Sequence, residues 1–436
     1  MLDPVTAGVL VAILLFVLLA AGVHIGVSLG LGGILGILVT IGPQAAWAQL
    51  ATIPFSTTNN FELAVIPLFI LMGALATQAG LTGELYAAAH AWLGRLPGGL
   101  AMATTLASAA FGAASGSTVV NAAIFTKMAM PEMTAYGYDK RLSAGCIAAA
   151  GTLASLIPPS ILMVIYGLIT EQSIGKLLIA GLVPGLLSAG MYLLVIWAWV
   201  KLRPEIAPTV DFRLSLAEKV RALRGVWGIG VLFVLVIGGI YTGYFAPTYA
   251  GAVGAFGAFL IVAAKRRLSR ETLIDTFKDA GITTSTIFII VIGGILLARF
   301  LTYAGLVTNL SDWLLGLELP ALMYLLSFAI LFLILGCFIE PIAIMVMTLP
   351  VMFPIMVSVG YDPIWLGVIS IKLAEMSLLT PPVGLNVYVV RSASPVPLTL
   401  EQVFAGVTPF LLGDVVMLAV LIAFPSIVTF LPDLMV

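Results

Sequence analysis

The chain has 436 residues, of which 61% are hydrophobic and only 9% are charged, and its formal net charge at pH 7 is -1. Soluble domains carry about a quarter of their residues as charges, so this composition excludes a soluble enzyme, and the high hydrophobicity excludes a disordered chain. The even balance of 19 basic and 20 acidic residues gives no indication of nucleic-acid binding. The composition therefore predicts an all-α polytopic membrane protein that contacts the lipid bilayer.

Apolar runs follow one another along the chain, most of them near or above the roughly 20 residues that a membrane-spanning helix needs. They cover residues 5–41, 63–80, 98–126, 142–170, 177–200, 226–263, 282–306, 320–358, 364–391 and 403–431. The first run breaks at Gly22–Gly26 and the sixth at Tyr241–Pro247, so each of these two runs predicts two helices. We interpret the runs 98–126 and 320–358 as re-entrant helical hairpins, with plain membrane spans as the alternative.

The pattern of glycine and proline residues recurs along the sequence at an offset of about 223 residues. With this offset, Gly137-Tyr138-Asp139 aligns with Gly360-Tyr361-Asp362, and Pro158-Pro159 aligns with Pro381-Pro382. Single matches are expected by chance in a chain rich in Gly and Pro, but several matches in one order indicate two copies of one unit.

These matches predict two repeats joined by a polar linker, each with one hairpin and one discontinuous helix. The predicted segments are the first repeat 1–200 with its hairpin at 98–126 and broken helix at 142–170, the linker 201–225, and the second repeat 226–436 with its hairpin at 320–358 and broken helix at 364–391.

Basic residues are distributed unequally between equivalent loops of the two repeats. Segment 264–279 holds five Lys and Arg residues, whereas its equivalent 42–62 holds none. Cytoplasmic loops concentrate Lys and Arg, so equivalent loops are predicted to lie on opposite sides of the membrane. With the N-terminus placed in the periplasm, all but three of the 19 basic residues fall on the inner side, including the six of the linker 201–225. Such inverted-topology repeats are typical of secondary transporters.

Transporters of this kind bind ions and substrate near the membrane midplane, where interrupted helices free backbone carbonyls and helix ends. The pairs Pro158-Pro159 and Pro381-Pro382 remove backbone donors and must break their helices. Hydroxyl and carbonyl oxygens at such breaks suit a hard cation, and free helix N-termini suit an anion. The alternative for the small and hydroxyl residues there is close helix packing.

Four ionisable residues fall inside predicted membrane segments, where charges are costly and usually functional. Glu340 lies at the tip of the second hairpin, Lys372 and Glu375 are three residues apart on one helix face, and Asp414 lies halfway along the last span. The alternative for Lys372 and Glu375 is a purely structural pair.

No nucleophile–base set, metal-ligand cluster, Walker loop or dinucleotide fingerprint occurs in the sequence. We therefore expect a protein that is not an enzyme and does not hydrolyse ATP. An intramembrane hydrolase is disfavoured because Ser115 and Ser117 have no nearby His. A passive channel or a scaffold subunit is a further alternative.

A series of motifs extends along essentially the whole chain. They are Ile66-Pro67-Leu68-Phe69 with Gly73, Gly94-Arg95-Leu96-Pro97-Gly98-Gly99-Leu100, Ser115-Gly116-Ser117, Gly137-Tyr138-Asp139, Ile157-Pro158-Pro159-Ser160, Gly336 to Pro341, and Thr380-Pro381-Pro382-Val383-Gly384-Leu385-Asn386. In this order they resemble the large membrane subunit (the DctM-like M subunit) of tripartite ATP-independent periplasmic (TRAP) transporters.

The resemblance implies an elevator-type transporter in the bacterial inner membrane, with Na⁺ as coupling ion and no covalent cofactor. It also implies two partners, a small four-helix membrane subunit and a periplasmic substrate-binding protein, and a small organic acid such as a C4-dicarboxylate or sialic acid as cargo. By motif position, Ser115, Gly116 and Ser117 would line a first ion site with the break before Pro158. Gly336 and Thr380 would line the second.

Taken together, the breaks and the resemblance predict two sets of site residues. The predicted cation ligands are Ser115, Gly116, Thr152, Ser155, Pro158, Gly336, Glu375 and Thr380. The predicted substrate-binding residues are Ser117, Thr118, Asn121, Ser160, Glu340, Pro382, Gly384 and Asn386. The alternative function is a stand-alone sodium/dicarboxylate symporter of similar architecture that needs no binding protein.

Overall fold

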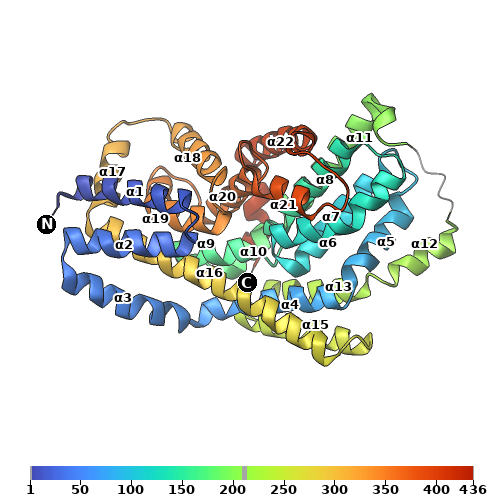
Figure 1. The fold of residues 1–436 in the computed structure, drawn as a ribbon, viewed down its shortest axis with the longest axis horizontal. Helices are drawn as coiled ribbons and strands as arrows, with labels where there is room; N and C mark the ends of the chain where they lie inside the picture. Colours follow the sequence, from blue (N-terminus) through green and yellow to red (C-terminus); the bar gives the residue numbers. More distant parts are fainter. Residues whose placement is uncertain (1, 209–213, 436) are drawn as a thin grey trace.

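A computed structural model describes residues 2–208 and 214–435 of the chain, so Arg213 of the predicted linker lies outside the described residues. The described residues form helices and connecting turns, and no strand occurs among them (Figure 1). Within these ranges six helices are long and apolar enough to cross a membrane, or seven if the bent pair at 216–241 is one span. The all-α polytopic membrane fold is therefore confirmed.

The first half of the chain forms eleven α-helices and two 3₁₀ turns. They are α1 (Pro4–Ala20), α2 (Ile25–Thr40), α3 (Pro43–Thr58), η1 (Phe61–Ala64), α4 (Val65–Gln78), α5 (Leu81–Leu93), α6 (Gly99–Ser115), α7 (Thr118–Ala135), α8 (Lys140–Thr152), η2 (Leu153–Ser155), α9 (Ile161–Thr170), α10 (Ile174–Ala180) and α11 (Leu182–Leu202).

The second half of the chain repeats the same order of hairpin and broken helix. Its elements are η3 (Pro204–Ile206), α12 (Leu216–Leu223), α13 (Trp227–Phe233), the π-helical turn η4 (Val234–Gly238), α14 (Gly239–Tyr241), α15 (Pro247–Ala264), α16 (Arg270–Tyr303), α17 (Leu306–Leu315), α18 (Ala321–Gly336), α19 (Pro341–Ser358), α20 (Pro363–Ser377), α21 (Leu385–Ala393), α22 (Leu400–Ala423) and α23 (Ser426–Asp433).

Both hairpins and both discontinuous helices of the expected fold are present. The hairpins are the pairs α6–α7 and α18–α19, and the broken helices are α8–α9 and α20–α21. The first hairpin continues to Ala135, beyond the 126 at which its apolar run stops. The difference arises because Lys127 ends the apolar run but not the helix, whose backbone hydrogen bonds continue through a more polar segment.

One group of helices, which we call the scaffold, consists of α1–α5 and α12–α17. Its long helix α16 has 34 residues and packs along α2, α3 and α4 (Figure 1). A Cβ added at Gly26 of α2 would lie 2.6 Å from the Ile289 carbonyl carbon of α16, and a Cβ at Gly33 would overlap the backbone at Leu296. Glycines therefore let α2 and α16 pack backbone against backbone, as small residues do in membrane proteins.

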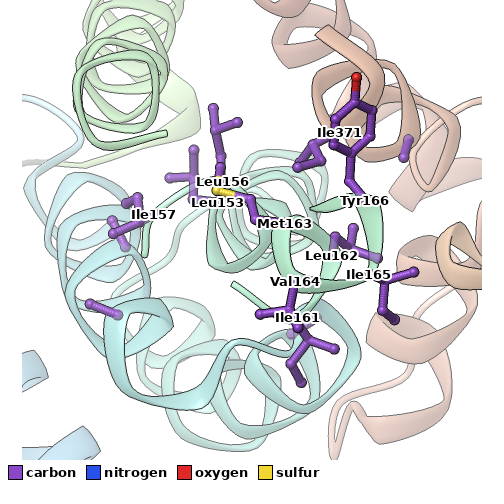
Figure 2. Packing of buried hydrophobic residues seen from close by; sticks show 14 of the residues in the cluster. Leu153, Leu156, Ile157, Ile161, Leu162, Met163, Val164, Ile165, Tyr166 and Ile371 are labelled. Atoms are coloured by element: carbon purple, nitrogen blue, oxygen red, sulfur yellow. The ribbon is translucent and has the colours of Figure 1, made fainter. Parts of the chain in front are cut away.

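The other group, which we call the central bundle, consists of α6–α11 and α18–α22. Its two halves interlock, because α8 packs on α22, α9 on α19 and α21 on α7. Figure 2 shows buried apolar side chains around the first break, including Leu153, Met163 and Tyr166, all of which are fully buried. The Tyr166 hydroxyl donates to the carbonyl of Pro363 at 2.8 Å, so α9 is also joined to the start of α20 by a hydrogen bond.

The crossing of α8 and α22 gives a first testable prediction. A Cβ at Gly145 would overlap the carbonyl of Gly406 and lie 2.8 Å from its Cα. Backbone atoms cannot rotate aside, so we expect Gly145→Ala to cost about 1–3 kcal/mol of stability, measured by thermal unfolding in lipid nanodiscs. The control is Gly190→Ala, where nothing lies within 4 Å of the added Cβ. Equal unfolding midpoints for the two variants would contradict the close crossing.

Candidate functional site

The first hairpin turns at Gly116 and Ser117. Gly116 has φ = +59°, a left-handed conformation that glycine adopts without strain. Ser117 then begins α7, and its Oγ accepts a hydrogen bond from the backbone N–H of Val120 at 3.5 Å. The Oγ of Ser115 is buried and has no hydrogen-bond partner among the described residues. The tip therefore presents an unpaired hydroxyl at the end of α6.

The break in the first discontinuous helix lies directly against this tip. It runs from the end of η2 to the start of α9 and contains the cis peptide bond Pro158–Pro159. Ser160 caps α9 and donates from its Oγ to the backbone carbonyl of Ser155. A Cβ added at Gly116 would lie 3.1 Å from the carbonyl oxygen of Pro159. Hairpin tip and helix break therefore bring hydroxyl and carbonyl oxygens together.

The tip of the second hairpin likewise lies against the second break. Cys337 donates from its Sγ to the carbonyl of Pro381 at 3.1 Å, and a Cβ added at Gly336 would overlap the side chain of Ser377. Glu340 begins α19, and its buried Oε1 has no hydrogen-bond partner within the described ranges. This tip therefore presents a carboxylate oxygen that is free to bind a ligand.

The second break contains the cis peptide bond Pro381–Pro382. The Oγ1 of Thr380 donates to a carbonyl one turn earlier at 2.7 Å, and Gly384 has φ = +61° where the chain turns into α21. Asn386, at the start of α21, donates from its Nδ2 to a carbonyl of α8 at 3.2 Å. A hydrogen bond thus joins the helix after the second break to the first repeat.

A cavity of about 440 Å³ lies between the hairpin tips and the scaffold helices α4 and α16. Six of the predicted site residues line it, namely Ser115, Gly116, Ser117, Thr118, Ser155 and Glu340. The others lie away from its wall, and they are Asn121, Thr152, Pro158, Ser160, Gly336, Glu375, Thr380, Pro382, Gly384 and Asn386. The cavity therefore gathers the first hairpin tip, one residue of the first break and the carboxylate of the second tip.

The scaffold contributes polar residues to this cavity that were not among the residues predicted from the sequence. Thr276, Asp279 and Thr283 of α16 line its wall, as do Thr77 and Gln78 of α4. Residues three or four apart share one face of a helix, so the three α16 residues form part of a polar stripe along one face of this helix. This spacing of polar residues could have indicated from the sequence that one face of α16 lines a polar site.

The charged side chains among the described residues that line the cavity are all acidic. Its lining includes the carboxylates of Asp279 and Glu340 but no Lys, Arg or His among the described residues. Hydroxyl and carboxylate oxygens are the ligands that hard cations prefer. The two carboxylates disfavour an organic anion in the same cavity unless cations bind with it, Glu340 more than the exposed Asp279. The arrangement therefore suits joint binding of a cation and an anion.

A buried cluster of charged residues lies behind the cavity. The Nζ of Lys372 lies 2.7 Å from Asp414 Oδ1 and 3.2 Å from Glu375 Oε2. The hydroxyl of Tyr192 donates to Asp414 at 2.9 Å, and the Oγ of Ser155 lies 2.9 Å from Glu375 Oε1. The pair of Lys372 and Glu375 is thus present, and the structure adds Asp414 to it.

The chain matches a family model described as the DctM component of the tripartite ATP-independent periplasmic transporter, over residues 12–427. This match covers more than nine tenths of the chain and leaves out only short segments at the two ends.

Two curated relatives carry the same description, C4-dicarboxylate TRAP transporter large permease protein DctM. The protein of Pseudomonas aeruginosa is 39% identical and covers 93% of this chain and 94% of its own length. That of Rhodobacter capsulatus is 33% identical and covers 97% of this chain and 98% of its own length. Both relatives therefore match from end to end.

Among solved structures, the YdaH transporter of Alcanivorax borkumensis has a similar fold. It superimposes with a TM-score of 0.62 at 17% identity, over 88% of this chain and 90% of the other. At this identity the similarity concerns the fold alone, and it agrees with an elevator-type arrangement of hairpins and broken helices.

Proposed function

We infer that this chain, which belongs to the DctM component family of tripartite ATP-independent periplasmic transporters, imports a small organic acid together with Na⁺ across the bacterial inner membrane. The observation that carries this proposal is the cavity between scaffold and central bundle. It offers unpaired oxygens at both hairpin tips, and its wall holds two carboxylates without a cationic side chain among the described residues.

The electrostatics of this cavity support the proposal of sodium coupling. An organic anion gains little from a wall that carries Asp279 and Glu340, so it needs cations bound beside it. The unpaired oxygens of Ser115 and Glu340 are suitable ligands for such cations. Cation and anion then bind better together than either does alone, and this mutual dependence is what couples their transport.

We propose that the central bundle moves as one body against the scaffold, and that the two repeats have inverted topology. The interlocked packing of α8, α9, α21 and α22 supports a rigid bundle. A Cβ at Gly73 of α4 would lie 2.8 Å from the Cα of Ser115, so the scaffold meets the bundle directly beside the cavity. A sliding contact here would expose the cavity alternately to the two sides. In this arrangement the N-terminus is periplasmic.

The substrate class rests on the relatives. Those 39% and 33% identical are named for C4-dicarboxylates, and others between 30% and 33% identical are named for isethionate, ectoine and sialic acid. We therefore propose a C4-dicarboxylate as the first candidate and treat the other three as competitors in the same assay.

The proposed partners are a small membrane subunit and a periplasmic substrate-binding protein. A relative from Oleidesulfovibrio alaskensis, 33% identical, is named DctMQ, and this chain covers 63% of its length. The remaining length of that relative leaves room for a fused second membrane component. We propose that a component of this kind works together with the present chain.

Uptake by all three components in proteoliposomes tests the proposal. Labelled C4-dicarboxylate is expected to accumulate under an inward sodium gradient and not under an equal potassium gradient. Equal rates in sodium and potassium would overturn the coupling. Undiminished uptake when the binding protein is omitted would instead favour the stand-alone symporter.

Ser115 gives a residue-level prediction for the sodium site. If its unpaired Oγ binds sodium, Ser115→Ala should raise the sodium concentration for half-maximal uptake about tenfold, which corresponds to loss of one good oxygen contact. Ser108→Ala is the matched control, because Ser108 is on the same helix, is also buried and also lacks a partner among the described residues, but does not line the cavity. The same shift in both variants would argue against a ligand role.

A further inference from the structure

Helix α12 carries an apolar stripe that the described part of the chain leaves uncovered. Leu216, Val220 and Leu223 are 71%, 51% and 46% exposed. Their spacing of four and three residues places them on one face of the helix. Trp227, the first residue of the next helix α13, is exposed as well. Contiguous exposed apolar side chains indicate a surface that binds a membrane or another molecule.

Basic residues border this stripe. With 3.6 residues per turn, Lys219 lies on one side of the stripe and Arg224 on the other, and Arg221 lies further round the helix. Glu218 lies on the opposite face, where its carboxylate accepts hydrogen bonds from Ser215. Within the described ranges neither Arg221 nor Arg224 forms an ion pair. An apolar stripe bordered by cations is typical of a helix that lies in the headgroup region of a membrane.

The position of α12 agrees with this interpretation. Figure 1 shows it beside α5, at the end of the molecule away from the N-terminus. Trp92 of α5 donates from its Nε1 to the carbonyl of Lys219 at 3.2 Å, and the Lys219 ammonium lies 5.9 Å from the centre of the Trp92 ring. A bend of 45° separates α12 from the apolar segment 227–241. The charges of α12 keep it out of the hydrocarbon core, and Trp227 suits the membrane–water interface.

The loop between α15 and α16 adds cations beside the same helix α5. Lys265 forms an ion pair with Glu84 of α5, and a Cβ added at Gly225, just after α12, would lie 3.1 Å from the Cβ of Glu84. The exposed guanidinium of Arg267 lies over the turn at Gly80, where an added Cβ would overlap it. Arg267 has no ion-pair partner in the described part of the chain. Cations from two segments that are distant in the sequence therefore gather along α5.

We propose that α12 and the loop 265–270 bind the headgroups of anionic phospholipids at the cytoplasmic surface of the membrane. The headgroup phosphates pair with the guanidinium groups, and the apolar stripe enters the boundary of the acyl chains. Basic segments next to a membrane span are attracted to the negative charge of the cytoplasmic leaflet. The predicted orientation places both basic segments on that side. The proposal goes beyond the proposed function and depends on neither its cargo nor its coupling ion.

A lipid surface is favoured over a partner protein by position and charge. A partner helix would need its own carboxylates to match these cations, whereas anionic headgroups supply phosphates at the level where Trp227 begins the next helix. The consequence for the fold is an anchor. Helix α5 ends at Leu93, and the first hairpin of the central bundle begins at Gly99. Bound lipid therefore holds the scaffold at the membrane surface close to its connection with the bundle.

Hydrogen–deuterium exchange of the purified full-length chain in nanodiscs tests the proposal. The backbone amides of 214–226 should exchange more slowly in nanodiscs that contain phosphatidylglycerol than in nanodiscs of phosphatidylcholine alone. Bound headgroups and a buried stripe would stabilise α12 and so protect its amides. Equal exchange of 214–226 in the two lipids would overturn the proposal.

Charge variants show which residues bind the lipid. Arg221→Gln/Arg224→Gln should raise the phosphatidylglycerol fraction for half-maximal protection about fivefold or more, whereas Arg221→Lys/Arg224→Lys should stay near the wild type. The control Lys127→Gln/Arg391→Gln removes two exposed cations from α7 and α21 of the central bundle and should also behave like the wild type. Equal shifts in the two Gln variants would contradict a site on α12.

Addition of the small membrane subunit distinguishes a lipid surface from a protein interface. Protection of 214–226 should depend on phosphatidylglycerol both with and without that subunit. Protection that appears only with the subunit, to the same extent in both lipids, would assign the stripe to a protein partner and overturn the proposal. The exchange measurement needs neither substrate nor sodium, so its failure leaves the proposed function intact.

Discussion

Oxidation of a Gly294→Cys/Val346→Cys double variant is expected to abolish substrate uptake, and reduction is expected to restore it. Gly294 lies on scaffold helix α16 and Val346 on hairpin helix α19, and a Cβ added at Gly294 would lie 2.7 Å from the Cβ of Val346. A disulfide needs about 3.5–4.5 Å between the two Cβ atoms, so a slight separation of the helices allows the bond. The bond fixes the central bundle to the scaffold and so prevents the proposed elevator movement.

The control is a disulfide that does not cross between the two groups of helices. Gly151 and Ala122 both belong to the central bundle, and a Cβ added at Gly151 would lie 2.9 Å from the Cβ of Ala122. Oxidation of a Gly151→Cys/Ala122→Cys variant should leave its uptake at the level of its own reduced form. Full uptake by the oxidised α16–α19 variant, with the disulfide verified by mass spectrometry, would refute movement at this contact.

Lys372→Met is expected to be the most destabilising single substitution in the charged cluster. It leaves the Asp414 carboxylate buried without the ammonium that lies 2.7 Å away. Removing one partner of a buried ion pair typically costs about 3–5 kcal/mol, and Met has nearly the length of the Lys side chain without its charge. The measurement is the unfolding midpoint of the purified protein in nanodiscs.

Two further variants isolate the charge effect. Lys278→Met changes an exposed lysine of α16 and should leave the midpoint nearly unchanged. The double variant Lys372→Met/Asp414→Asn removes both charges and should recover part of the loss, because the two residues are in contact. The structural role of the ion pair is refuted if Lys372→Met unfolds at the same temperature as Lys278→Met.

The local features of the fold were predictable from the sequence because their causes are local. Proline pairs break helices wherever they occur, and both pairs lie at the breaks of the discontinuous helices. The glycine turns at Gly22–Gly26 and Tyr241–Pro247 likewise separate α1 from α2 and α14 from α15. The extent of α7 was underestimated, because Lys127 ends the apolar run while the helix continues to Ala135.

The site was predictable only in part, because its contacts join distant residues. The tip residues at 115–118 were identified from their own composition, and they line the cavity. Asp279 was not identified, because its importance comes from lying opposite the hairpin tips. Asp414 was recognised as an intramembrane charge, but Tyr192, 222 residues away, donates to it, and no local pattern connects the two.

Sodium and an organic acid are proposed to cross the membrane together through the cavity between scaffold and central bundle. The most direct measurement is the simultaneous uptake of labelled sodium and labelled C4-dicarboxylate in proteoliposomes that contain all three components. Sodium is expected to enter only when the dicarboxylate is present, at a fixed ratio of ions to substrate, and Ser115→Ala is expected to weaken both fluxes in parallel. Dicarboxylate uptake without sodium entry, or sodium entry that ignores the dicarboxylate, would contradict coupled transport.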